Sequence, residues 1–268
     1  MHEQNELYAS KIFFNAALPL LKVIANDVPS LKAQFDKLTT VLQVSALDPE
    51  AEGGKYATHF IITEGEWETK LNAAHEAPDV ELEFKTIEAM NAFFKGKIGP
   101  KTLPKMKGVF KNFAAFKAML MTLLKLSALT GATEPPKDEE TKTLMVKCFF
   151  YLLSSGISQL NKMGHTEIKE WTSKSPDRVY AFAVDGHPEV SAFIRIKAGK
   201  SRAGRGEYKR AMPFFTLRFN NLDSALGILL SIDDMLEATK AGRLIMDGGP
   251  EFGAQLGGFM LEVGALAK

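Results

Sequence analysis

The fold is decided by residues 80–98, which read VELEFKTIEAMNAFFKGKI. The first five residues alternate apolar and acidic side chains, which predicts a strand with one buried face and one wet face. Beyond them, Ile87, Met90 and Phe94 recur at helical spacing, and Phe93 borders the same face. The change of period predicts a strand followed by a short amphipathic helix.

The same change of period occurs later in the chain. Residues 215–229 read FTLRFNNLDSALGIL and follow residues 80–94 at an offset of 135. Residues 11–14, KIFF, return as residues 147–150, KCFF, at an offset of 136. Because such matches keep their order at a nearly constant offset, the sequence predicts two copies of one whole domain. The alternative is one large α+β domain with accidental similarities, since chain length allows one or two domains.

The expected copies are residues 1–134 and 135–268, with Pro135 and Pro136 in the linker. In each copy we expect an opening helix, four strands in an antiparallel meander, a helix, a short strand and a closing helix. Pro19 is expected to kink the first opening helix. The expected strands are 41–46, 59–62, a strand near Trp67, 80–84 and 108–111, then 179–184, 193–196, a strand near Tyr208, 215–219 and 242–246.

Composition restricts the class of protein. Lys and Arg number 33 and Asp and Glu 32, so the net charge of +1 argues against nucleic acid as the main partner. A single cysteine, Cys148, and a polar, acidic N-terminus without a secretory pattern favour a cytoplasmic protein. The longest apolar stretch, residues 113–129, is interrupted by Lys117 and Lys125, so we expect no transmembrane segment.

The expected closing helices, 113–129 and 252–266, differ in composition. The first is apolar nearly all round, which predicts burial on several sides. The second carries Gly253, Gly257, Gly258 and Gly264. Either another backbone or a ligand approaches these glycines closely, or the helix is short and frayed.

The order of these elements resembles the sterol carrier protein type 2 family. The residues that carry the resemblance are 80–84, 89–98 and 107–111 in the first copy and 215–219, 224–230 and 242–248 in the second. The resemblance implies an α+β fold of two tandem sterol-carrier-like domains, each a curved, mainly antiparallel sheet covered by helices. It also implies an apolar tunnel that holds sterols, fatty acyl chains or acyl-coenzyme A.

The expected ligand-binding residues are Phe and Met side chains with their aliphatic neighbours, because such side chains repack around apolar ligands. Their alternative role is to fill two ordinary cores. The expected residues are Met90, Phe93, Phe94, Met106, Phe110, Phe116, Leu120 and Leu123 in the first copy, and Leu226, Leu229, Leu230, Met235, Leu244, Met246, Phe252, Leu256 and Met260 in the second.

Polar constellations are few. We predict no catalytic residue, metal or cofactor, because the histidines are scattered and no Gly-x-Ser-x-Gly motif occurs. Lys200, Arg202 and Arg205 are expected to lie in a hairpin tip that carries solvated charge or contacts an anionic headgroup.

The sequence therefore predicts a non-catalytic protein that binds or transfers lipids or other apolar ligands. A homodimer or a partner enzyme is compatible with this prediction. One alternative is a scaffold or enzyme-accessory protein whose cavities have collapsed. Another is an acyl-coenzyme A-handling enzyme, whose marker would be a buried polar cluster with a perturbed pKa inside a pocket.

Overall fold

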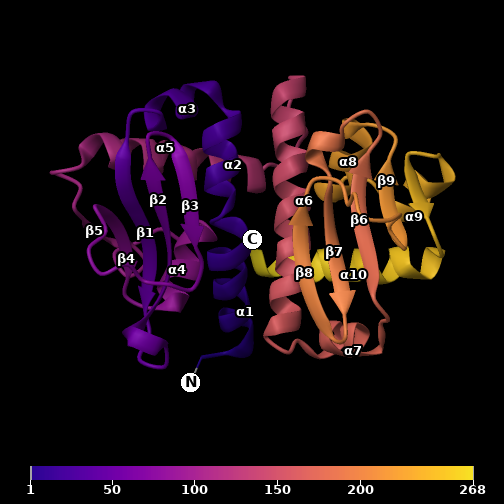
Figure 1. The fold of residues 1–268 in the computed structure, drawn as a ribbon, viewed down its shortest axis with the longest axis horizontal. Helices are drawn as coiled ribbons and strands as arrows, with labels where there is room; N and C mark the ends of the chain where they lie inside the picture. Colours follow the sequence, from indigo (N-terminus) through magenta and orange to yellow (C-terminus); the bar gives the residue numbers. More distant parts are fainter. Residues whose placement is uncertain (1, 268) are drawn as a thin grey trace. The chain divides into compact units, whose positions relative to one another are not determined.

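The computed structural model describes residues 2–267, which form two compact units. Unit 1 comprises the described residues up to Ala128 together with Leu266 and Ala267, and unit 2 comprises Leu129–Ala265. Each unit has a five-stranded sheet and helices (Figure 1), which confirms the predicted α+β class.

The elements of unit 1 follow the predicted order. They are α1 (Gln4–Ile12), the π-helical turn η1 (Phe13–Ala17), α2 (Leu20–Asp27), α3 (Pro29–Phe35), β1 (Thr39–Leu47), the 3-10 turn η2 (Glu52–Gly54), β2 (Lys55–Thr63), β3 (Glu66–Lys70), β4 (Val80–Phe84), α4 (Ile87–Phe94), β5 (Lys105–Lys107) and α5 (Phe113–Thr130).

Unit 2 repeats this order with one additional helix, α9. Its elements are α6 (Glu139–Lys162), α7 (Thr166–Lys174), β6 (Arg178–Val184), the 3-10 turn η3 (Pro188–Val190), β7 (Ala192–Lys197), β8 (Lys200–Arg205), β9 (Phe215–Phe219), α8 (Leu222–Leu229), α9 (Met235–Lys240), β10 (Leu244–Asp247) and α10 (Pro250–Ala267).

The two sheets share one topology. Their orders are β3-β2-β1-β4-β5 and β10-β9-β6-β7-β8, which match when the second is read from its other edge. In each sheet the first strand pairs in parallel with the fourth, β1 with β4 and β6 with β9, and the other pairings are antiparallel. The sheets are therefore mainly antiparallel, as predicted.

The predicted meander is wrong in both units. After β3, residues 71–79 cross over the sheet instead of turning back tightly. The backbone N–H of Ala73 donates to Ala57 O at 3.1 Å, and that of Asp79 donates to Val41 O at 2.9 Å. This long connection returns β4 to the free edge of β1, where only a crossover can produce a parallel pair.

Two predicted strands are displaced, and glycine explains each displacement. A Cβ at Gly108 would lie 1.8 Å from Asp79 O, so Gly108 follows β5 instead of starting it. Ala198 and Gly199 both have positive φ and form a two-residue hairpin turn between β7 and β8. The third strand of unit 2 therefore lies before Tyr208, not beside it.

The opening helix of unit 1 breaks where Pro19 predicts a kink. Pro19 has no N–H, and immediately before it the N–H of Leu18 donates to Phe13 O at 2.8 Å, five residues back. In unit 2 the corresponding helix, α6, continues unbroken for 24 residues. Asp138 begins it by accepting a hydrogen bond from the N–H of Thr141 at 2.8 Å.

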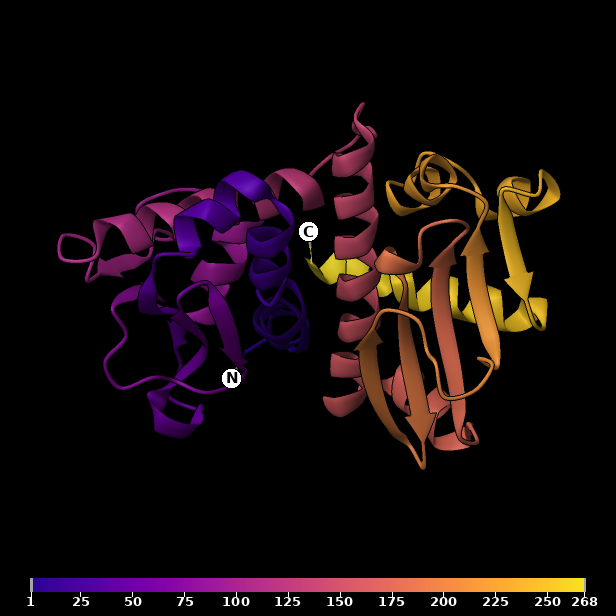
Figure 2. The same ribbon diagram turned by 45° about the horizontal axis from the view of Figure 1, so that its top comes forward.

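Helices pack against the sheet in each unit. In unit 1, α4 lies beside α1 (Figure 1), where Asn91 Nδ2 donates to Glu6 O at 2.9 Å. In unit 2, α10 runs across the strands (Figure 2), and its Phe252 ring lies 6.3 Å from the ring of Tyr180 on β6. Fully buried Phe84 and Phe219 occupy the core of their respective units.

Candidate functional site

Four phenylalanines gather in unit 1 where η1, β4 and α4 meet. The rings of Phe13 and Phe94 stack with their centroids 4.0 Å apart, and those of Phe93 and Phe94 lie 5.4 Å and 5.7 Å from that of Phe84. Phe84 is fully buried, whereas Phe13, Phe93 and Phe94 are half-buried. We call these three accessible rings the aromatic wall of unit 1.

Local sequence signals place the wall. Thr86 starts α4, since its Oγ1 accepts a hydrogen bond from the N–H of Ala89 at 3.1 Å, and this cap fixes the direction of the helix that carries Phe93 and Phe94. Phe13 is the first residue of η1, and π-helical turns are rare and often lie at functional sites. The sequence analysis identified Phe93 and Phe94 but missed Phe13, although the KIFF motif and Pro19 both mark it.

Unit 2 fills the corresponding place differently. The counterparts of Phe13 and Phe14 are Phe149 and Phe150, both buried in α6. Phe150 lies 5.5 Å from Phe182 and 6.0 Å from Phe219, ring to ring. On α8 the counterparts of Phe93 and Phe94 are aliphatic, Ile228 and Leu229. The aromatic wall therefore has no equivalent in unit 2.

The predicted residues of the first copy fall into three classes of exposure. Met90 and Leu123 are buried, and Phe93, Phe94 and Phe116 are half-buried. Met106, Phe110 and Leu120 are exposed, with Phe110 at 103%. The structure thus brings Phe93 and Phe94 together in the wall and leaves Met106 and Phe110 on the surface.

The predicted residues of the second copy are more covered. Leu226, Leu244, Leu256 and Met260 are buried, and Leu229, Leu230, Met235, Met246 and Phe252 are half-buried. Phe252 belongs to an aromatic cluster, with its ring 4.8 Å from Phe214 and 6.4 Å from Phe215. The guanidinium of Arg178 lies 3.7 Å from the Phe214 ring. The rings of this cluster therefore contact one another, and the Arg178 guanidinium lies over the Phe214 ring.

Helix α5 contradicts the prediction of burial on several sides. One face, which includes Ala118, Met119 and Thr122, is buried. The opposite face leaves Phe113 and Leu124 exposed at 63% and 56%. The apolar composition is therefore no guide to burial, because α5 packs through a single face.

Three helical segments within the described residues are long and apolar enough to cross a membrane, judged by length and composition only. By that measure Lys117 and Lys125 do not exclude α5, contrary to the sequence argument. Residues 4–27 and 139–162 are 72% and 78% buried over the most apolar window, whereas the window in α5 is only 33% buried. Among the three, α5 is the segment whose apolar surface faces outward.

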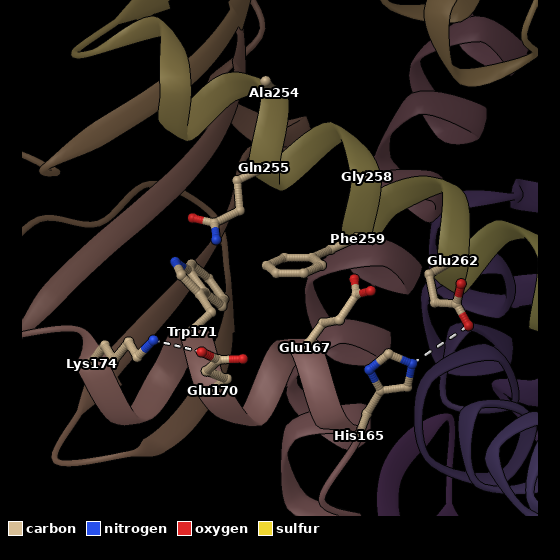
Figure 3. Close-up of a pocket in the computed structure, with 10 residues that line it drawn as sticks. All are labelled: His165, Glu167, Glu170, Trp171, Lys174, Ala254, Gln255, Gly258, Phe259 and Glu262. Atoms are coloured by element: carbon tan, nitrogen blue, oxygen red, sulfur yellow. Dashed lines mark hydrogen bonds and ion pairs between the residues drawn. The ribbon is translucent and has the colours of Figure 1, made fainter.

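A pocket of about 490 Å³ lies between α7 and α10 in unit 2 (Figure 3). Its aromatic floor is formed by Trp171 and Phe259, whose rings lie 5.0 Å apart. The remaining lining residues are mostly polar or small: His165, Glu167, Glu170, Lys174, Ala254, Gln255, Gly258 and Glu262. None of the predicted ligand-binding residues lines this pocket.

The charged rim of this pocket is largely paired. His165 Nε2 lies 3.5 Å from Glu262 Oε1, and Lys174 Nζ lies 2.5 Å from Glu170 Oε1, as Figure 3 shows. Trp171 and Phe259 are 9% and 6% exposed, so little of the aromatic floor is accessible. The sequence analysis missed this pocket because its residues come from two helices about 90 positions apart and form no motif.

Helix α10 runs for 18 residues, so the predicted fraying is wrong. Close approach holds for Gly253 and Gly257, against the side chains of Met246 and Met235, and not for Gly258 and Gly264. A Cβ at Gly253 would lie 2.4 Å from Met246 Sδ, and one at Gly156 on α6 would lie 2.5 Å from Val263 Cγ1. Gly258 has nothing within 4 Å and borders the pocket. Small residues thus let α6, α10 and β10 pack closely in unit 2.

The basic segment of unit 2 lies on the edge strand β8. Lys200, Arg202 and Arg205 are exposed. Arg205 lies over the Tyr151 ring, with its guanidinium 5.0 Å from the ring centroid. The predicted hairpin tip is wrong for these residues, because Ala198 and Gly199 form the tip and β8 already starts at Lys200. The headgroup contact stays a prediction.

A buried polar cluster lies on one face of the first sheet. Glu81 Oε1 accepts hydrogen bonds from Ser45 Oγ at 2.6 Å, Gln43 Nε2 at 2.7 Å and Lys55 Nζ at 2.9 Å, and Lys107 Nζ donates to Oε2 at 3.0 Å. Burial alone would raise the pKa of Glu81, but these bonds outweigh it and lower the pKa to about 2. A carboxylate so stabilised is a poor general acid or base near neutral pH.

One group of side chains among residues 2–267 has the spacing of a metal site. The ligand atoms of His2, Asp48 and Glu50 lie within 4.8 Å of one another. His2 also contacts Glu88, and first Glu88 and then Asp48 raise the pKa of its imidazole. The two carboxylates favour the protonated imidazole, whereas a metal would need the neutral form, so proton and metal would compete for His2.

Neither a protein-family model nor a curated protein matches the sequence. Similar solved structures include a conserved hypothetical protein, possibly a sterol carrier protein, from Thermus thermophilus, at 18% identity and TM-score 0.30, covering 44% of this chain and 92% of that chain. Sterol carrier protein 2 matches at 18% identity and TM-score 0.28, covering 43% and 96%. A sec-alkylsulfatase from a Pseudomonas species matches at 12% identity and TM-score 0.27, covering 69% and 32%.

Proposed function

We propose that this protein binds or transfers lipids or other apolar ligands without converting them, and that the aromatic wall of unit 1 is the main binding surface. One observation carries the proposal. Phe13, Phe93 and Phe94 remain only half-buried although their rings contact one another and the fully buried Phe84. Rings that serve only the core, such as Phe84, are completely covered.

The energetics suit an acyl chain or a polycyclic body. Covering one methylene group stabilises a complex by about 0.8 kcal/mol, so several methylenes against the wall offset the entropy cost of binding. The wall also includes a stacked ring pair, which presents a flat face instead of a flexible one. Binding of this kind needs no reacting group.

The non-catalytic part of the proposal is supported by the state of the buried carboxylate of Glu81. The four hydrogen bonds to Glu81 occupy its oxygens and hold its pKa at about 2. The cluster therefore has the perturbed pKa of the enzyme alternative, but it is ionised and saturated, which favours a structural role.

We also infer that the two units arose by duplication of one sterol-carrier-like domain, over residues 1–134 and 135–268. The common strand order and the shared parallel pairing of the first and fourth strands support this inference. In this account unit 2 has kept the topology and replaced the wall with aliphatic and glycine-rich packing.

Native mass spectrometry of the purified chain, followed by solvent extraction, tests the proposed function. We expect a copurifying lipid at one equivalent per chain. Leu120→Asp on α5 of unit 1 and Leu261→Asp on α10 of unit 2 replace exposed leucines and should both leave the lipid bound. Phe94→Asp should remove it. A clean apoprotein that also rejects fluorescent fatty acids would contradict the proposal.

The scaffold alternative has one observation in its favour, the exposed apolar face of α5. Monomeric proteins seldom expose large contiguous apolar patches unless these bind something. A lipid-free chain that retains one protein partner in a pull-down, and loses it with Leu124→Asp, would favour this alternative.

A further inference from the structure

Unit 1 carries a long segment without acidic side chains. Between Glu88 and Glu134 the sequence has no Asp or Glu. The same stretch contains eight lysines: Lys95, Lys97, Lys101, Lys105, Lys107, Lys111, Lys117 and Lys125. The near-zero net charge of the whole chain conceals this local excess of positive charge.

Most of these lysines are available to an external partner. Lys107 is engaged by Glu81 and Glu83 in the buried cluster. The other seven make no ion pair with any residue in the described part of the chain, and six of them are exposed. These lysines alternate along the sequence with exposed apolar residues.

The apolar side chains of the same stretch are unusually exposed. Ile98, Leu103 and Met106 are 68%, 50% and 59% exposed before α5, and Phe110 is 103% exposed in the turn that leads to it. On α5 itself the exposed apolar residues are Phe113, Leu120, Met121 and Leu124. These eight residues and the seven free lysines are named the basic apolar surface of unit 1.

Helix geometry places the α5 residues on one side. At 100° per residue, Phe113, Lys117, Leu120, Met121 and Leu124 fall within roughly one-third of the helix circumference. The buried residues, such as Ala118 and Thr122, fall on the opposite side. The helix thus presents an apolar stripe with a lysine inside it, while its other face is anchored in unit 1.

We propose that this basic apolar surface docks unit 1 onto an anionic lipid bilayer, with α5 lying in the plane of the interface. Apolar side chains that enter the acyl boundary and lysines that meet anionic headgroups are the two contributions to interfacial binding. Because the opposite face of α5 is buried in its own unit, the helix lies on the membrane and does not span it. The inference extends the proposed function by stating where the ligand would be exchanged.

Charge complementarity selects this occupant over the others. A second copy of the chain would bring lysines against lysines, which opposes association. Nucleic acid would use the lysines but would leave aliphatic side chains such as Ile98, Leu103 and Leu124 uncovered. An anionic bilayer would pair its headgroups with the lysines and cover the apolar side chains with its acyl region.

Co-sedimentation of the full chain with lipid vesicles tests the proposal. We expect binding to phosphatidylcholine vesicles that contain about one-third phosphatidylserine, at least tenfold weaker binding to phosphatidylcholine alone, and a decline with added salt. Lys111→Glu with Lys117→Glu should lower the anionic binding at least tenfold, as should Phe110→Ser with Leu124→Ser. Matched changes in unit 2 outside its basic segment, Lys137→Glu and Met212→Ser, replace exposed residues and should have less than a twofold effect.

Equal binding to neutral and anionic vesicles, or no loss in the unit 1 variants, overturns the proposal. So does a concentration-dependent dimer in analytical ultracentrifugation that Leu124→Ser abolishes, because the surface would then be an interface between copies. Titration of the same variants with a soluble fluorescent fatty acid, without vesicles, keeps this test separate from the proposed function. That binding should be unchanged in the Phe110 and Lys111 variants.

Discussion

Unit 1 and unit 2 share their strand order but differ in the side chains that occupy equivalent places. At the C-terminal end of the helix that follows the fourth strand, unit 1 has Phe93 and Phe94 on α4, whereas unit 2 has Ile228 and Leu229 on α8. The rings of unit 1 stay accessible, and Phe149 and Phe150 of unit 2 are buried. One topology therefore holds either an aromatic wall or a closed core, and the break of the opening helix at η1 and the residues at the end of α4 or α8 distinguish the two cases.

The charged side chains on the two sheets also differ. In unit 1 the charged cluster is buried around Glu81. In unit 2, Arg218 lies on the surface between Asp247 and Asp185, at 2.8 Å and 2.9 Å. The hydrogen bonds of Asp247 and then Asp185 raise the pKa of Arg218. At the offset of 135, Arg218 corresponds to Glu83 and Thr216 to Glu81, so unit 2 lacks the buried carboxylate and has a basic residue in place of Glu83.

The largest effect is expected where the polar cluster is buried. Glu81→Gln should lower the free energy of unfolding by about 3 kcal/mol, because Lys55 and Lys107 lose their ion pairs with the buried Glu81 carboxylate and keep only Glu83. Arg218→Gln on the exposed face of unit 2 should cost less than about 1 kcal/mol. Urea denaturation monitored by circular dichroism measures both, and equal losses would contradict the comparison.

The second-largest loss of stability is expected at low pH, where protonation of Glu81 weakens the same cluster. The folded pKa of Glu81 is depressed to about 2, so its contribution is present above its unfolded pKa of about 4.3 and is lost as pH falls towards 2. We expect about 2 kcal/mol less stability at pH 2 than at pH 5 from this group, with screening by water included. In Glu81→Gln this part of the acid dependence should vanish, and an unchanged pH profile would contradict the assignment.

A smaller loss of stability is expected where α6 and α10 pack closely in unit 2. A Cβ at Gly156 would lie 2.5 Å from Val263 Cγ1. Gly156→Ala should therefore destabilise the chain by about 1.5 kcal/mol through overpacking, although alanine favours helix. Adding Val263→Ala should restore part of the loss. Thermal unfolding of the single and double variants measures this coupling, and simple additivity would argue against the contact.

The smallest expected effect has the opposite sign. Gly258 lies within α10, and a Cβ added there would meet no atom within 4 Å. Gly258→Ala should stabilise the chain by about 0.5–1 kcal/mol through helix propensity alone, which thermal unfolding measures. A loss of stability at this position would show that the pocket bordered by Gly258 is filled in solution.

The sequence predicted the regular elements best where the apolar period was unambiguous. The strict alternation of residues 80–84 and 215–219 located β4 and β9 to the residue. Local patterns say nothing of which strand pairs with which, so the parallel return of β4 to β1 was missed. The prediction that Gly108 starts a strand is wrong, because its φ of +75° lies outside the extended region that a strand requires.

The candidate site was predicted in part. Phe93 and Phe94 were identified from helical spacing, which also selected buried Met90, whereas exposed Phe110 was predicted on the short strand 108–111. The spacing of apolar residues distinguishes the faces of a helix but does not show which faces are buried. For this reason the prediction that α5 is buried on several sides was wrong. The Glu81 cluster was missed because Gln43, Ser45 and Lys107 meet it only through strand register.

Titration of a fluorescent fatty acid into the wild-type chain, Phe94→Asp and Leu229→Asp tests the central claim most directly, with circular dichroism to confirm that each variant is folded. The two changes place the same carboxylate at equivalent positions of the two units, and Phe94→Leu serves as the mild control. We predict one site per chain, lost in Phe94→Asp, weakened in Phe94→Leu and kept in Leu229→Asp. Two sites, or loss of binding in Leu229→Asp alone, would contradict the assignment of the ligand to the aromatic wall of unit 1.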